Sequence, residues 1–213
     1  MKTKFLFLFL LASIFGWGQI SITSLPYNKS DNFDGYNPTN ATNATSTIAA
    51  GWTYTAGSNN FRGRTDSPGN SNGLYGLGTN PDYSLGALRT GSNVHNYSIS
   101  FTNNSGATIT ALTISWNYEQ WSFNNTSGWN LTGTGQLSSN TTVNATDFIG
   151  VTSGTKGDST PISLNLNDLN ITNGQSFGFS FSTTDQNRSG HRASHRWDCP
   201  SMPSWRGTPA AGS

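Results

Sequence analysis

Cysteine, glutamate and charged residues in general are scarce in this chain of 213 residues. The single cysteine, Cys199, excludes an intrachain disulfide and any metal site built from several cysteines. Only 10% of the residues are charged and the formal charge at pH 7 is +1. There is therefore no basic face for nucleic acid and no charge run for adhesion to a membrane surface. Strong helix formers are also few, which argues against long helices.

The chain is rich instead in serine, threonine, asparagine and glycine, with 24 glycines in all. Such a composition alone is typical of disorder, but 12% of the residues are aromatic, which indicates a packed core. Apolar and polar residues alternate strictly in four segments: 97–101, 112–118, 162–166 and 177–181. Period two over such lengths predicts half-buried antiparallel strands.

The connections between these strands are polar and rich in turn-forming residues. The stretch "TNNSGAT" (102–108) separates the first two strands and predicts a hairpin loop. Several short strands joined by such turns, with no helical period between them, predict an all-β fold. We expect an antiparallel β-sandwich with jelly-roll-like topology.

The N-terminus has the layout of a secretory signal. Lys2 and Lys4 precede the apolar run "FLFLFLLASIFGW", which is too short to span a bilayer as a helix. We predict a signal peptide over residues 1–18, cleaved after Gly18, and therefore a protein that is secreted or held at the cell surface. A membrane anchor is the alternative for this segment, but after cleavage we expect no stable membrane insertion.

An aromatic stretch, "WNYEQWSF" (116–123), raises the question of a binding surface. Trp116 and Tyr118 continue the inward alternation of their strand, whereas Trp121 breaks it. Exposed aromatic rings stack on the apolar faces of sugars. If the chain has a ligand platform, it consists of Tyr118, Trp121, Phe123 and Trp129; packing in or beside the core is the alternative interpretation.

No constellation of catalytic residues is visible in the sequence. Glu119, the one glutamate, has the opposite parity to Trp116 and is predicted to be a solvated or loop-bonded carboxylate that faces away from the core. Glycoside hydrolysis needs two carboxylates about 5 to 10 Å apart, but the nine aspartates are scattered through turn-like contexts. His95 stands alone before a strand and is predicted to be a surface or loop residue, without a nucleophile beside it. The sequence therefore predicts a protein that is not an enzyme.

A calcium site is one interpretation of "SDNFDGYN". Asp31, Asn32 and Asp34 offer several oxygens, which calcium prefers as ligands. The spacing is not that of a helix–loop–helix calcium site, and Asx turns explain the same residues. No other cofactor is expected.

The segment from Asn187 to Ser213 differs from the rest, with four arginines and no Val, Ile, Leu or Phe. His191, His195 and Cys199 allow a zinc or copper site, and the composition equally fits a disordered tail. A third hypothesis is a frameshift near Arg188 that replaced the last strand. The loss of that strand would expose backbone groups and part of the core.

Four motifs resemble a β-sandwich module found near the N-terminus of secreted proteins of Bacteroidota and related bacteria. They are "GLYGLG" (73–78), "SLGAL" (84–88), "YSISFTNNSGATITALTISWNYEQW" (97–121) and "NGQSFGFSF" (173–181). The resemblance covers residues 33–186; it implies a sandwich fold and an extracellular location, and it supplies no catalytic residues. We expect the β-sandwich module to extend over residues 19–186.

These observations predict a secreted, non-catalytic β-sandwich module that binds a glycan or another cell-surface component, or acts as a spacer. The alternative is the N-terminal accessory fragment of a larger secreted hydrolase, such as a nuclease, whose catalytic domain is missing from this chain.

Overall fold

The structure, a computed structural model, describes residues 18–35, 41–42, 51–56, 60–67, 72–88, 94–121, 128–144, 147–149 and 153–184. Within these ranges the chain forms strands and one short helix, α1 (Thr141–Asn144). The described part holds no helix that is long and apolar enough to cross a membrane. The predicted signal peptide, except Gly18, and the 187–213 tail with its histidines and cysteine lie outside the described residues.

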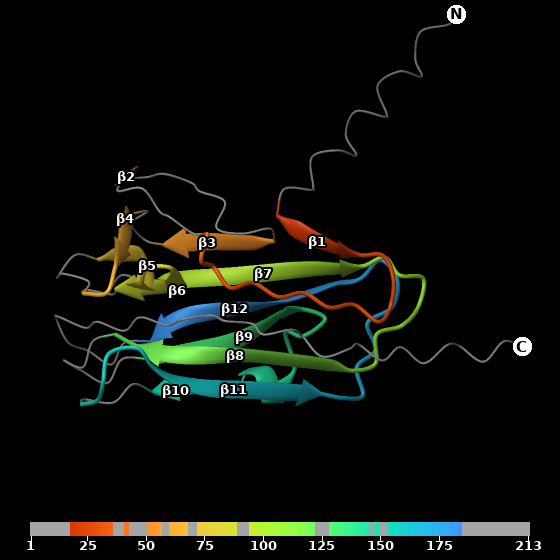
Figure 1. The fold of residues 1–213 in the computed structure, drawn as a ribbon. Helices are drawn as coiled ribbons and strands as arrows, with labels where there is room; N and C mark the ends of the chain where they lie inside the picture. Colours follow the sequence, from red (N-terminus) through yellow and green to blue (C-terminus); the bar gives the residue numbers. More distant parts are fainter. Residues whose placement is uncertain are drawn as a thin grey trace, which may run out of the picture.

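The largest sheet has six strands (Figure 1). Five of them follow the order β1 (Gln19–Ile22), β7 (His95–Asn103), β12 (Ser176–Thr184), β9 (Gly128–Gly135) and β10 (Asp147–Ile149). The sixth, β3 (Trp52–Ala56), pairs with residues 95–99 of β7, and β1 pairs with residues 100–103. β1 runs parallel to β7, whereas the other pairs in this sheet are antiparallel.

A second sheet pairs β8 (Leu112–Gln120) antiparallel with β11 (Asp158–Leu166). Side chains of the two sheets share one hydrophobic core. The ring of Trp116 on β8 meets that of Phe181 on β12 edge-on, with centroids 5.8 Å apart. Two sheets packed face to face over a common core form a sandwich, so the predicted all-β sandwich is confirmed.

Much of the core comes from the apolar residues that alternate along the predicted strands, although on β11 only Leu166 is buried and Ile162 and Leu164 are half-buried. On β7 the residues Tyr97, Ile99 and Phe101 are all buried, and the serines between them are less so. β8 and β12 follow the same pattern with their apolar positions. Each fully buried side chain of this size contributes on the order of 1.5 to 3 kcal/mol through removal of apolar surface from water.

The predicted hairpin between the first two of these strands is wrong. β7 lies in the six-stranded sheet and β8 in the other, so the loop that joins them crosses from one sheet to the other. Asn103 holds the start of this loop: its side-chain amide donates to the carbonyls of Ala107 and Ile171, both at 2.8 Å. The polar turn residues therefore shape the loop, but the two strands that it connects do not pair with each other.

A third sheet lies at one end of the sandwich (Figure 1). It has the order β2 (Ala41–Thr42), β4 (Asn60–Thr65), β5 (Gly73–Thr79) and β6 (Asp82–Leu88), with β4 parallel to β5. Leu74, Leu85 and Ala87 join the main core, whereas Tyr75, Leu77 and Leu88 form a second cluster. β5 and β6 are therefore buried on both faces over most of their length.

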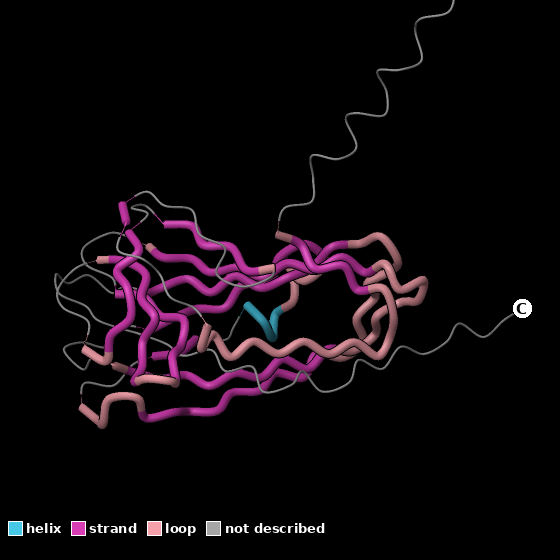
Figure 2. The backbone as a smooth tube through the Cα atoms, turned by 45° about the horizontal axis from the view of Figure 1, so that its top comes forward, coloured by secondary structure: helices cyan, strands magenta, loops and turns pink. Residues whose placement is uncertain are grey.

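The segment that follows β1, residues 23–35, runs as a loop along the side of the sandwich, between its two sheets (Figure 2). Leu25 and Tyr27 pack against the core, and Phe33 is buried with its ring centroid 5.4 Å from that of Trp52. This loop therefore covers core residues where no strand does.

Candidate ligand-binding cleft

A cleft of about 400 Å³ lies where the third sheet meets the end of β8 and β11. It is lined by the residues after β4 (Asp66, Ser67), the turn between β5 and β6 (Gly78, Thr79, Asp82), the end of β8 (Glu119, Trp121) and the loop before β11 (Lys156, Gly157). Four chain segments that are far apart in the sequence thus meet around one cavity.

A tight turn between β5 and β6 builds one wall. Thr79 pairs with Asp82, and Asn80 and Pro81 form the turn with a cis peptide bond between them. Gly78 has a φ of +146°, and a Cβ at this position would overlap the backbone carbonyl of Asp82. Glycine is therefore required here for Asp82 to come this close to β5.

Glu119 lies on the face of β8 opposite to Trp116, as its parity predicts, but it is not solvated. Its exposure is 5% of the maximum, and it lies where the end of β8 and the third sheet line the same cleft. The carboxylate oxygen Oε2 accepts a hydrogen bond from the indole Nε1–H of Trp121 at 3.1 Å. Of the two predicted alternatives, the solvated carboxylate is therefore wrong, and the bond to Trp121, which follows the end of β8, fits the loop-bonded one.

Trp121 is half-buried, and its ring is held from several sides. It packs against the second cluster of the third sheet. Gly157, at a φ of +80°, lies so close that an added Cβ would be 3.0 Å from the ring atom Cζ2. The Gly157 N–H donates to the Gln120 carbonyl at 3.0 Å, which fixes the loop against β8. The indole is thus a fixed wall of the cleft.

Lys156 joins two walls of the cleft. Its ammonium Nζ donates to the hydroxyl of Ser67 at 3.0 Å, across 89 positions of sequence. This contact is exposed, so it contributes little to stability, but it places the positive charge beside the end of β4.

The structure separates the four predicted aromatic residues. Trp121 lines the cleft, and Tyr118 is half-buried against the core, where burial raises the pKa of its phenol. Trp129 is 0% exposed and packs against Tyr97 at 5.1 Å between centroids, so no surface ligand reaches it. Phe123 lies outside the described residues. The prediction of Trp129 as a ligand-platform residue is therefore wrong.

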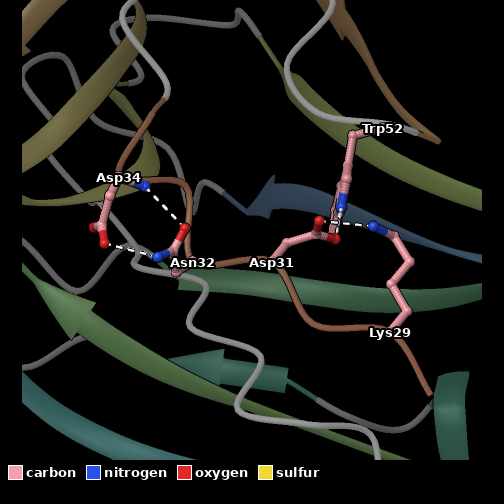
Figure 3. Close-up of polar contacts among 5 residues, drawn as sticks. All are labelled: Lys29, Asp31, Asn32, Asp34 and Trp52. Carbon is pink, nitrogen blue, oxygen red and sulfur yellow. Dashed lines mark hydrogen bonds and ion pairs between the residues drawn. The ribbon is translucent and has the colours of Figure 1, made fainter.

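The three predicted calcium ligands do not converge on one point (Figure 3). Asp31 turns toward the Lys29 ammonium, at 2.7 Å, and accepts the indole N–H of Trp52 at 2.8 Å. Asn32 and Asp34 bond to each other instead, with the Asn32 amide donating to the Asp34 carboxylate at 2.8 Å. These contacts are of the Asx type that the sequence also allowed, and the calcium site stays a prediction.

Metal ligands are not gathered elsewhere in the parts of the chain that the structure describes. Within those ranges no group of three or more His, Cys, Asp or Glu side chains is arranged to hold a metal ion. His191, His195 and Cys199 fall outside them.

His95, predicted at the surface, is 0% exposed. Its Nε2 lies 2.8 Å from the side-chain oxygen of Asn72, and its Nδ1 lies 2.6 Å from the hydroxyl of Tyr54. The residue begins β7 rather than a loop, and it pairs with Ala56 of β3. Its ring bonds hold Tyr54 and Asn72 in place, and it is not one of the residues that line the cleft.

Sequence reasoning missed most of the cleft. Asp66, Asp82 and Lys156 come from three turns that local patterns do not connect. The signal that was available is the motif "GLYGLGTNPD", in which a glycine-rich strand runs into a tight turn that ends in an acid. The motif predicts the turn, but it does not predict which other segments of the chain lie beside the turn in the fold.

Comparisons with known proteins add little to this description. No protein-family model matches the chain, and neither does any curated protein. One solved structure that it resembles is an isomalto-dextranase of Arthrobacter globiformis T6 complexed with panose, with a TM-score of 0.37 and 11% sequence identity. The match covers 86% of this chain and 33% of that enzyme.

Proposed function

We propose that the protein is a secreted, non-catalytic β-sandwich module that binds a glycan or another cell-surface component in the cleft beside Trp121. The observation that carries this proposal is the combination of one fixed, half-exposed indole with carboxylates and an ammonium around a single cavity. An indole face matches the apolar face of a sugar ring, and the charged groups accept or donate hydrogen bonds to its hydroxyls.

The dimensions of the cleft support a small ligand or one segment of a longer one. Its volume falls within the range of about 300 to 1,000 Å³ that is usual for ligand sites. The walls are held by backbone bonds and by the contact between Glu119 and Trp121, so little ordering is required on binding. Secretion is proposed because of the predicted signal peptide over residues 1–18.

The test is affinity electrophoresis of the chain, without its predicted leader, in gels that contain galactomannan, xyloglucan or hydroxyethylcellulose. We expect retardation in at least one gel, and we expect Trp121→Ala to lose it, with affinity reduced by about tenfold or more because a stacking aromatic is removed. Trp121→Phe, which keeps a flat ring but loses the bond to Glu119, should retain part of the binding.

Two controls accompany this test. The thermal midpoint of Trp121→Ala is measured so that lost binding is not confused with unfolding. Reducing ends are assayed after incubation with each polysaccharide, and their release by the unmodified chain would contradict the non-catalytic part of the proposal. Retardation that is unchanged in Trp121→Ala would place any binding outside this cleft.

A further inference from the structure

The charged groups around the cleft are unbalanced. Three carboxylates, those of Asp66, Asp82 and Glu119, face one ammonium, that of Lys156, a formal excess of two negative charges. The carboxylates come from three different segments of the chain: Asp66 follows β4, Asp82 begins β6 and Glu119 lies near the end of β8. The whole chain has a formal charge of +1, which makes the negative potential a local property of this cleft.

The positions of the charges strengthen their effect on a ligand. Glu119 is buried, and a charge on a ligand near it would interact through a medium less polar than water. Lys156 is directed to the hydroxyl of Ser67. A carboxylate or sulfate on a ligand would therefore meet three like charges against one ammonium, which also bonds to Ser67 in the cleft wall.

We propose that the cleft selects neutral or amine-bearing glycans and rejects those that carry carboxylates or sulfates. This inference rests on the proposed function and names its ligand class. Hydroxyl and ammonium groups donate to carboxylates in charge-assisted hydrogen bonds, which are stronger than bonds between neutral groups. Like charges brought together in an interface cost enough to exclude a ligand, so the same residues give both affinity and specificity.

The experiment compares each polysaccharide that retards the chain with its own C6-oxidised form, in which primary hydroxyls have become carboxylates. Backbone, linkage and chain length are thereby matched. We expect the oxidised form to bind about tenfold more weakly or worse, since like-charge contact opposes it. The difference should shrink between about 50 mM and about 500 mM NaCl, because salt screens charges at exposed positions.

The double variant Asp66→Asn and Asp82→Asn keeps the shape of both side chains and removes two negative charges. We expect the ratio of its affinity for the neutral form to its affinity for the oxidised form to fall by about tenfold from that of the unmodified chain, whatever affinity for the neutral form is lost with the charged acceptors. Its thermal midpoint checks that the fold is retained, and the single variant Asp168→Asn, at an exposed position outside the cleft, serves as a matched control.

The outcomes separate the two proposals. Trp121-dependent binding of oxidised forms as tight as that of neutral forms overturns the charge selection and leaves the binding function standing. Tighter binding of an oxidised form than of its neutral form would likewise overturn the charge selection and leave the binding function standing. No binding of any form overturns the proposed function, and the inference with it.

Discussion

At the scale of single residues, Tyr54 and His95 form a buried polar pair. With the imidazole neutral, its Nε2–H donates to the Asn72 side-chain oxygen, so Nδ1 is left to accept the hydroxyl of Tyr54 at 2.6 Å. Burial raises the pKa of the Tyr54 phenol well above its usual value near 10. A phenolate at this position would lose both its solvation and its ability to donate to His95.

This pair predicts how stability depends on alkaline pH. A raised pKa in the folded state means that the contribution of Tyr54 is fully present below about pH 10, the value in the unfolded chain, and is lost as pH rises further. Tyr54→Phe should be less stable by about 1 to 2 kcal/mol at about pH 8, where it loses the hydrogen bond. Its stability should then fall less steeply between about pH 9.5 and about pH 11.5.

Urea unfolding of both proteins across this pH range measures the effect. Tyr118, whose pKa burial also raises, remains in both proteins and sets the residual slope. Parallel pH profiles for the two proteins would show that Tyr54 ionises as easily in the folded chain as in the unfolded one.

At the scale of elements, β12 depends on a glycine at its centre. β12 pairs with β7 on one side and β9 on the other, so its backbone has neighbours at both edges. A Cβ at Gly178 would overlap the carbonyl oxygen of Ile99 and lie 2.9 Å from the Thr134 hydroxyl oxygen. The carbonyl belongs to the β7 backbone and cannot move without disturbing the ladder.

Gly178→Ala should therefore destabilise the protein by about 3 kcal/mol or more, at the upper end of the cost of overpacking. Chemical unfolding measures the loss of stability. A low soluble yield, with loss of the β signal in circular dichroism, would indicate a larger loss of stability in the same direction. Gly35→Ala is the matched control, because an added Cβ there has no atom within 4 Å. Equal stability of the two variants would show that β12 and β7 separate easily at this point.

The elements also show why the sequence predicts part of the fold and not the rest. Strands with one buried face, such as β7 and β8, are visible from their alternation. β5 and β6 are buried on both faces and rich in glycine, so they have no alternation. Because the third sheet was not predicted, the burial of Glu119 beside it could not be predicted either.

The hairpin error has a related cause. Polar turn residues indicate that the chain reverses, but they do not say whether the next strand pairs with the previous one or crosses to the opposite sheet. The connection from Asn104 to Ala111 is long enough to cross the roughly 10 Å between packed sheets. Long-range pairing, which decides between the two, leaves no local pattern in the sequence. The cleft depends on the same kind of contact, and only Trp121 and the β5–β6 turn were within reach of sequence reasoning.

At the scale of the whole molecule, the question is whether the sandwich is closed. The frameshift hypothesis predicts a replaced last strand and an open core. Within the described ranges, however, Val94 is the one large hydrophobic side chain that is clearly exposed, at 39%. The segment 23–35 covers part of the core with Leu25, Tyr27 and Phe33.

We therefore expect the chain, without its predicted leader, to unfold in one cooperative transition with a midpoint of about 45 °C or higher, and to bind no hydrophobic dye before it. Trp116→Ala, which removes the ring that meets Phe181 across the core, is the positive control for dye binding. Cooperative unfolding without dye binding would remove the support for a missing strand. A broad transition with dye binding in the unmodified chain would instead indicate that the chain lacks a strand that its core needs, and the coding sequence beyond Gln186 would then be read in all three frames.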